Sequence, residues 1–208
     1  MFLERKITGR LHGNEFAEFS AILGWKALKD SVDQYGDDED GFTQLVPQLN
    51  GKDPDDAFSS VPYVPLFNES TNEQEKGFNL LYEIQSKVGG AQVFEPFMPA
   101  YFSHFRFKSL STVEFKDFLY SWFINEHGDD MKRRLDAVDW DKWLHNRGMP
   151  PVTPQFDMTL ATPPYDLAKR WSKAASENRD PESLGFMKSD LKGWFAGQIC
   201  ISHDLGTV

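Results

Sequence analysis

The chain has 208 residues, and its 22 Lys and Arg stand against 32 Asp and Glu, a formal net charge of −10 at pH 7. Nucleic-acid binding needs clustered Lys and Arg, so this acidic balance argues against a nucleic-acid partner. Hydrophobic residues make up 40% of the chain and aromatic residues 14%, which excludes disorder over most of its length. Cys200 is the single cysteine, so an intramolecular disulfide is impossible.

The hydropathy pattern contains no membrane or secretion signal. No window holds the roughly 18–20 apolar residues of a membrane span, and Met1–Leu3 runs at once into the charged segment Glu4–Lys6. We therefore expect a cytoplasmic protein with no membrane partner.

The first residues already show a helical pattern. Leu3, Ile7 and Leu11 recur every four residues, which is the spacing of one helix face. No capping residue or polar lead-in precedes them, so the pattern suggests a chain that lacks its beginning. His12-Gly13-Asn14 breaks the pattern, and Asn14 is a candidate N-cap for a second helix to about residue 32.

The rest of the chain is also predicted to be helical, with loops between the helices. Asp33–Gly41 is acidic, but Tyr35 and Asp38 occupy the third and sixth positions, where a calcium loop needs a ligand oxygen and a glycine. We interpret this run as a solvated turn and residues 47–76 as a loop. A further helix is predicted over residues 77–88, with Gly89-Gly90 as its C-cap. Another begins at a capping box, Ser111–Glu114, and runs through residue 123. Two more are predicted over residues 164–176 and 189–195.

General catalytic motifs are absent from the sequence. None of the five histidines lies four residues from another, so the zinc motif H-E-x-x-H is missing. His12 and Glu15 lie three residues apart, but a metal site needs more ligands than one such pair. These observations alone predict an acidic all-α protein without a defined activity.

A series of short segments indicates a more specific class of protein. The segments are Leu3–Ile7, Gly9–Gly13, Asp53–Asp55, Phe58–Tyr63, Glu75–Phe78, Asp117–Tyr120, Asp139–Trp140, Gly148–Pro151, Asp157–Leu160 and Lys169–Trp171. In this order they resemble the leukotriene A-4 hydrolase/aminopeptidase branch of the gluzincin zinc metallo-aminopeptidases. The resemblance covers about residues 2–195.

The resemblance implies a zinc-dependent aminopeptidase with a thermolysin-like catalytic domain and a helical C-terminal domain. The family's zinc ligands come from H-E-x-x-H and from the Glu of a W-L-N-E-G segment, which would fall a few residues before Met1. A catalytic zinc needs about three protein ligands, so we expect this chain alone to bind no zinc and to be inactive. We then expect a fragment, or a gene model that starts late and ends early.

The resemblance also assigns candidate site residues. Tyr63 matches the family's catalytic tyrosine, whose O–H stabilises charge that develops on the peptide carbonyl oxygen. Asp55 matches the carboxylate that directs water in epoxide opening, and a simple capping role is an equal alternative for this substrate-binding candidate. Glu4 matches a carboxylate close behind the zinc site. Phe58 stands where vertebrate relatives carry Tyr, which argues against epoxide hydrolase activity.

One insertion separates this chain from the family pattern. In the family, Glu-Lys-Gly directly follows the catalytic tyrosine, whereas here Val64–Gln74 lies between Tyr63 and Glu75. This mostly polar run is expected to loop out. It is either a retained intron or a true loop.

The expected architecture is all-α. Residues 1–148 would form the helical lobe of the catalytic domain, 149–163 a proline-rich linker, and 164–208 the truncated start of an armadillo-like helical domain. The expected function is that of a fragment of a metallo-aminopeptidase that acts on peptide substrates. The alternative is a non-enzymatic helical interaction module derived from the peptidase.

Overall fold

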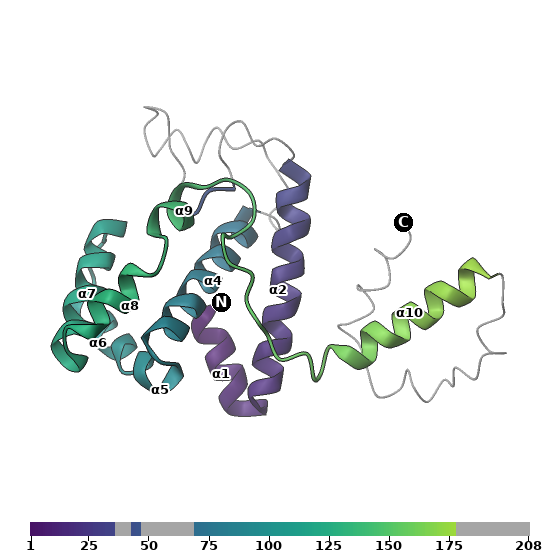
Figure 1. The fold of residues 1–208 in the computed structure, drawn as a ribbon, viewed down its shortest axis with the longest axis horizontal. Coiled ribbons are helices and arrows are strands. Elements are labelled where there is room, and N and C mark those ends of the chain that lie inside the picture. The colour runs from purple at the N-terminus through teal and green to yellow at the C-terminus, as the bar shows by residue number, and fades with distance from the viewer. Residues whose placement is uncertain (36–42, 47–68, 178–208) are drawn as a thin grey trace.

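A computed structural model of the protein describes residues 1–35, 43–46 and 69–177, and this part of the chain contains helices and no β-strand (Figure 1). The predicted all-α fold class is therefore confirmed for these residues. Their helices are α1 (Phe2–His12), α2 (Asn14–Tyr35), α4 (Glu69–Val88), α5 (Ala91–Phe94), α6 (Phe97–His104), α7 (Thr112–His127), α8 (Asp130–Asp136), α9 (Trp140–His145) and α10 (Thr162–Ser176).

Helices α1 and α2 form a hairpin around a glycine. Gly13 has φ 108°, a conformation that glycine adopts without a steric penalty, and its N–H donates to the Gly9 carbonyl at 3.0 Å. A Cβ on Gly9 would lie 3.3 Å from the Ala17 Cβ, so a small residue lets the two helices approach. The break predicted at residues 12–14 is confirmed.

Helix α4 is central, because α1, α2, α5 and α8 all pack against it (Figure 1). The sequence predicted its start at Gly77, and that prediction was wrong, since α4 begins at Glu69. Residues 69–76 have no apolar periodicity, but their Glu, Gln and Lys favour helix and acidic side chains stabilise a helix N-terminus. The Val64–Gln74 run was expected to loop out, yet its last residues, 69–74, are helical.

The main core is rich in aromatic residues and lies largely between α4 and the helices that follow it, with Phe2 of α1 and Ala21 of α2 at its edge. The rings of Phe94, Phe97 and Phe123 lie with centroids 5.5–6.0 Å apart, a spacing at which aromatic pairs attract. Leu119 and Phe123 of α7 are fully buried. The apolar stripe predicted for α7 from its helical spacing is therefore confirmed as core.

Both ends of α7 follow from local sequence. The Ser111 hydroxyl accepts from the Glu114 N–H, and the Glu114 carboxylate accepts from the Ser111 N–H at 2.7 Å. This is the capping box that the sequence predicted. Gly128, with φ 86°, follows the last residue of the helix.

Residues 146–161 form a helix-free segment between α9 and α10. The segment passes over α4 (Figure 1). There the Phe156 ring lies 5.4 Å from the Tyr82 ring and 6.5 Å from the Phe78 ring. Ala161 at its end is fully buried. The predicted division into domains at residues 149–163 stays a prediction, and the predicted helix at 189–195 lies outside the described residues. Among the helices of the described part, none is long and apolar enough to cross a membrane.

Candidate functional site

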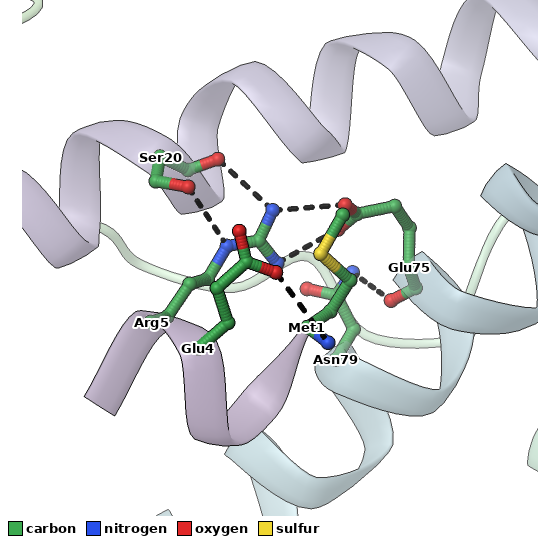
Figure 2. A network of polar contacts seen from close by, with 6 residues as sticks. All are labelled: Met1, Glu4, Arg5, Ser20, Glu75 and Asn79. Carbon is green, nitrogen blue, oxygen red and sulfur yellow. Dashed lines mark hydrogen bonds and ion pairs between the residues drawn. The ribbon is translucent and has the colours of Figure 1, made fainter. Parts of the chain in front are cut away.

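Three of the residues singled out from the sequence, Asp55, Phe58 and Tyr63, lie outside the described residues. Glu4 lies in the first turn of α1, and its side chain is 70% exposed. Its carboxylate is 3.9 Å from the terminal amine of Met1 (Figure 2). Glu4 is thus separate from the buried polar groups of the fold.

A buried ion pair joins α1 to α4 close to Glu4 in sequence (Figure 2). Arg5 donates from Nη1 to Glu75 Oε2 at 2.8 Å and from Nη2 to Glu75 Oε1 at 2.9 Å. Both side chains are almost fully buried. A bidentate pair of this kind fixes orientation as well as distance, so it holds the first half of α4 against α1.

Two further N–H groups of Arg5 bond to Ser20. Its Nη2 donates to the Ser20 carbonyl at 3.0 Å and its Nε to the Ser20 hydroxyl at 3.3 Å (Figure 2). The guanidinium lies 4.1 Å from the centroid of the Phe78 ring, within the range of a cation–π interaction. Arg5 therefore connects three helices, α1, α2 and α4, through one planar group.

Lys76, the next residue after Glu75, is a second buried anchor. Its Nζ donates to the Thr43 carbonyl and, at 3.2 Å, to the Asn146 carbonyl. The Thr43 hydroxyl accepts from the Gly148 N–H at 2.7 Å. These contacts tie the segment 43–46 to both the first half of α4 and the chain after α9. They bring together parts of the chain that the sequence alone did not connect.

The buried contacts on either side of residues 47–68 show what the Glu-Lys-Gly motif does in this chain. Val46, just before these residues, donates its N–H to the Leu144 carbonyl at 2.9 Å, and Glu75 and Lys76 follow them in α4. The Glu-Lys-Gly motif is therefore structural in this chain. Its charges hold helices in place, and neither is exposed to act on a substrate.

A cavity of about 410 Å³ lies between α1, α2, α4 and α5. Among its lining residues, Glu95 accepts from Arg10 at 2.7 Å and pairs with Lys6 at 3.4 Å. The Tyr82 hydroxyl donates to the Glu18 carboxylate at 3.2 Å. The charged groups of the cavity are thus largely paired with each other.

The electrostatics of the cavity oppose acid–base chemistry near neutral pH. Burial raises the pKa of Glu95, but the hydrogen bonds and charges of Arg10 and Lys6 outweigh burial and hold it below its ordinary value. Burial, and after it the Glu18 charge, raise the pKa of Tyr82 to about 12. A general acid or base works best with a pKa near the working pH, and neither group meets that condition.

The described residues also do not suit a catalytic zinc ion. Within the described ranges, no three His, Cys, Asp or Glu side chains converge as a metal-binding group, whereas such a site needs about three protein ligands. We therefore derive no reaction step through zinc from this part of the chain.

Sequence reasoning missed the pairing of Arg5 with Glu75 and the role of Gly24. A Cβ on Gly24 would overlap the Arg5 guanidinium and the Glu75 carboxylate. Arg5 and Glu75 both lie in segments that carried the family resemblance, which was the available signal. Their distance of 70 positions in the sequence concealed the contact.

Solved structures define the class of this fold. The chain superposes on the structure of native leukotriene A4 hydrolase from Saccharomyces cerevisiae with a TM-score of 0.77 and 38% sequence identity, over 97% of this chain and 30% of that one. A yeast leukotriene A4 hydrolase in complex with bestatin matches with a TM-score of 0.70 and 38% identity. The described helices therefore form an all-α segment of leukotriene A4 hydrolase type.

Curated relatives show which branch of proteins this segment resembles in sequence. The chain is 42% identical over 194 residues to leucine aminopeptidase 2-2 of Scheffersomyces stipitis and 41% identical over 201 residues to leucine aminopeptidase 2 of Emericella nidulans. These matches cover 93% and 97% of this chain but only 28% and 29% of the relatives. No family model matches the chain. The predicted resemblance is confirmed, and the chain is homologous to one segment of the leukotriene A-4 hydrolase/aminopeptidase branch.

Proposed function

We propose that this chain is one segment of a zinc-dependent metallo-aminopeptidase that releases N-terminal residues from short peptides. The observation that carries the proposal is the identity of 41–42% to leucine aminopeptidases over nearly the whole chain. In the assembled enzyme Tyr63 would donate its hydroxyl proton in a hydrogen bond to the carbonyl oxygen as negative charge develops there. Asp55 would contact the substrate.

We propose further that the 208-residue chain alone is inactive. Its sequence contains no H-E-x-x-H, and the described side chains do not gather as a metal site. After dialysis, the purified chain should retain no stoichiometric zinc by elemental analysis and should not hydrolyse leucine anilide. Bound zinc together with chelator-sensitive hydrolysis would contradict this.

The role of Tyr63 is testable in a chimera. The chimera is the leucine aminopeptidase 2 of Emericella nidulans with its matching segment replaced by this chain. In it, Tyr63→Phe should lower kcat by about 100- to 1000-fold with little change in KM, because the lost hydrogen bond matters mostly in the transition state.

Tyr165→Phe is the matched control, since it removes the same hydroxyl from a half-buried tyrosine in α10. This variant should keep the parent kcat. A Tyr63→Phe chimera within a factor of three of its parent would show that Tyr63 is only structural. Zinc content is matched between variants, so that loss of metal does not imitate loss of the hydroxyl.

The second candidate is a non-enzymatic helical interaction module derived from the peptidase. The exposed apolar residues on α1, Leu3, Ile7 and Leu11, favour it. A folded, monomeric 208-residue chain whose chimera shows no aminopeptidase activity would support the module. An active chimera would support the enzyme segment.

A further inference from the structure

The cavity between α1, α2, α4 and α5 has the size of a small-molecule site. Its volume of about 410 Å³ falls within the roughly 300–1,000 Å³ that is typical of ligand pockets. Small residues on three of its helices leave this space, Gly9 on α1, Ala17 on α2 and Ala91 on α5. Ligand sites combine apolar walls with a few charged groups that orient the ligand, so the charges of the cavity indicate which ligand fits it.

One part of the cavity wall carries a surplus positive charge. Glu95 pairs with Lys6 at 3.4 Å and accepts a hydrogen bond from Arg10 at 2.7 Å. Burial raises the pKa of Glu95, but the two cations outweigh burial and hold it below its ordinary value, so Glu95 is ionised at neutral pH. Two cations thus share one carboxylate, and the group attracts a further anion.

Another part of the wall carries a carboxylate whose hydrogen-bond donors are neutral. Glu18 accepts from the Tyr82 hydroxyl at 3.2 Å and from the Asp157 N–H at 3.3 Å. Within the ranges that the structure describes, no cation pairs with Glu18. Glu18 is half-buried, and a carboxylate partly removed from water gains from a cation beside it. This part of the cavity therefore favours a positively charged group.

Apolar side chains line the same cavity. Phe2, Ala21 and Phe78 are buried residues of the core that also border the cavity. The centroids of the Phe2 and Phe78 rings lie 6.0 Å apart. Two rings and a methyl group form a surface that favours an apolar group over water.

We propose that this cavity binds a small zwitterion with an apolar body. The carboxylate of the ligand faces Lys6 and Arg10, its ammonium group faces Glu18, and its apolar body lies against the aromatic rings. A ligand with a single charge satisfies only one of the two charged groups and leaves the other without a counter-charge. A free apolar amino acid and a short apolar peptide share the required chemistry. The proposal goes beyond the proposed aminopeptidase reaction, because binding here needs neither zinc nor bond cleavage.

Calorimetric titration of the 208-residue chain at neutral pH tests the charge requirement. The zwitterionic probes are L-leucine and leucyl-leucine, L-leucinol keeps only the ammonium group, and 4-methylpentanoate keeps only the carboxylate. At least one zwitterion should bind about tenfold or more tightly than either singly charged compound. The tighter zwitterion shows whether the ligand is a free amino acid or a peptide. Equal affinity for all four compounds, or no saturable binding of either zwitterion, would overturn the proposal.

Substitutions locate the site. Glu18→Gln should weaken the tighter zwitterion at least about tenfold and leave 4-methylpentanoate within about twofold, because only the zwitterion has an ammonium group to lose its partner. Arg10→Gln should weaken the zwitterion and 4-methylpentanoate but leave L-leucinol unchanged. Glu15→Gln is the matched control, since Glu15 lies in the same helix α2 and does not line the cavity.

The control variant should bind the zwitterion within about twofold of the parent chain. Equal losses from Glu18→Gln and Glu15→Gln would overturn the proposal, because binding would then not depend on the cavity. Circular dichroism checks that each variant keeps the helical content of the parent. The comparison of the four compounds on the parent chain decides the charge requirement even where a variant does not fold.

Discussion

At the scale of single residues, Gly24 leaves room for the Arg5–Glu75 ion pair. Gly24 lies in α2, and its missing side chain leaves the space that the guanidinium and the carboxylate occupy. Removing one partner of a buried pair leaves an uncompensated charge, which costs about 3–5 kcal/mol. We therefore expect the ion pair to depend on this glycine, despite its poor helix propensity.

Alanine at Gly24 tests this dependence. Alanine favours helix by about 1 kcal/mol over glycine, but its Cβ would separate Arg5 from Glu75, so Gly24→Ala should destabilise the chain by about 2 kcal/mol or more. Gly77→Ala is the control, because a Cβ there would meet only the Leu45 Cδ1 at 3.9 Å. It should stabilise α4 by about 0.5–1 kcal/mol. Urea unfolding gives the free energy of unfolding of both variants. A Gly24→Ala chain more stable than its parent would show that the Arg5–Glu75 pair does not depend on Gly24.

The Tyr82–Glu18 contact predicts a pH dependence. Burial first and the Glu18 carboxylate second raise the pKa of Tyr82 from 10.0 to about 12. The folded chain thus favours the neutral phenol, so this contribution to stability is full below pH 10 and is lost as the pH rises through about 12.

Titration by phenolate absorbance checks the prediction, with the Tyr82→Phe spectrum subtracted to isolate one tyrosine. Glu18→Gln should move the pKa of Tyr82 down towards 10.0 but not fully to it, because burial remains. An unchanged pKa in Glu18→Gln would mean that the carboxylate has no part in the shift.

At the scale of elements, α4 is held by different forces along its length. Its first half is fixed by the buried polar groups of Glu75 and Lys76. Its second half is fixed by apolar burial, with Ile84 and Val88 fully inside the core. The polar half sets the orientation of the helix, while the apolar half supplies most of its packing energy.

Helix α7 depends on its N-terminal cap. Ser111→Ala removes the hydroxyl that accepts from the Glu114 N–H and should cost about 1 kcal/mol of unfolding free energy. Ser109→Ala is the control, since Ser109 is exposed and lies before the helix. Thermal unfolding should separate the two variants, and equal midpoints would show that the cap contributes nothing.

At the scale of the whole molecule, periodic helices could be predicted and long-range pairing could not. The spacing of Leu119 and Phe123 identified α7 and its buried side. The spacing of Leu3, Ile7 and Leu11 identified α1 equally well but not which side faces inward. That side is decided by Arg5, whose partner Glu75 lies 70 positions away.

The start of α4 was missed for another reason. Residues 69–74 carry no apolar pattern, so their helix follows from propensity and from the turns that come after them. The candidate site depended on family resemblance, which proposed Tyr63 and Asp55, both outside the described residues, and matched Glu4 to a carboxylate behind the zinc site, an assignment that stays a prediction.

The contact between Lys76 and Thr43 has a consequence for how this chain tolerates change in length. It fixes both ends of the stretch from residue 44 to residue 75, whose last residues, 69–75, already belong to α4. The entropy of closing a loop grows only with the logarithm of the loop's length, about 0.6 kcal/mol for each doubling. A few residues added between positions 47 and 68, before α4 begins, should therefore cost only a few tenths of a kcal/mol. Such an insertion would leave the contacts of Glu75 with Arg5 and of Lys76 with Thr43 unchanged.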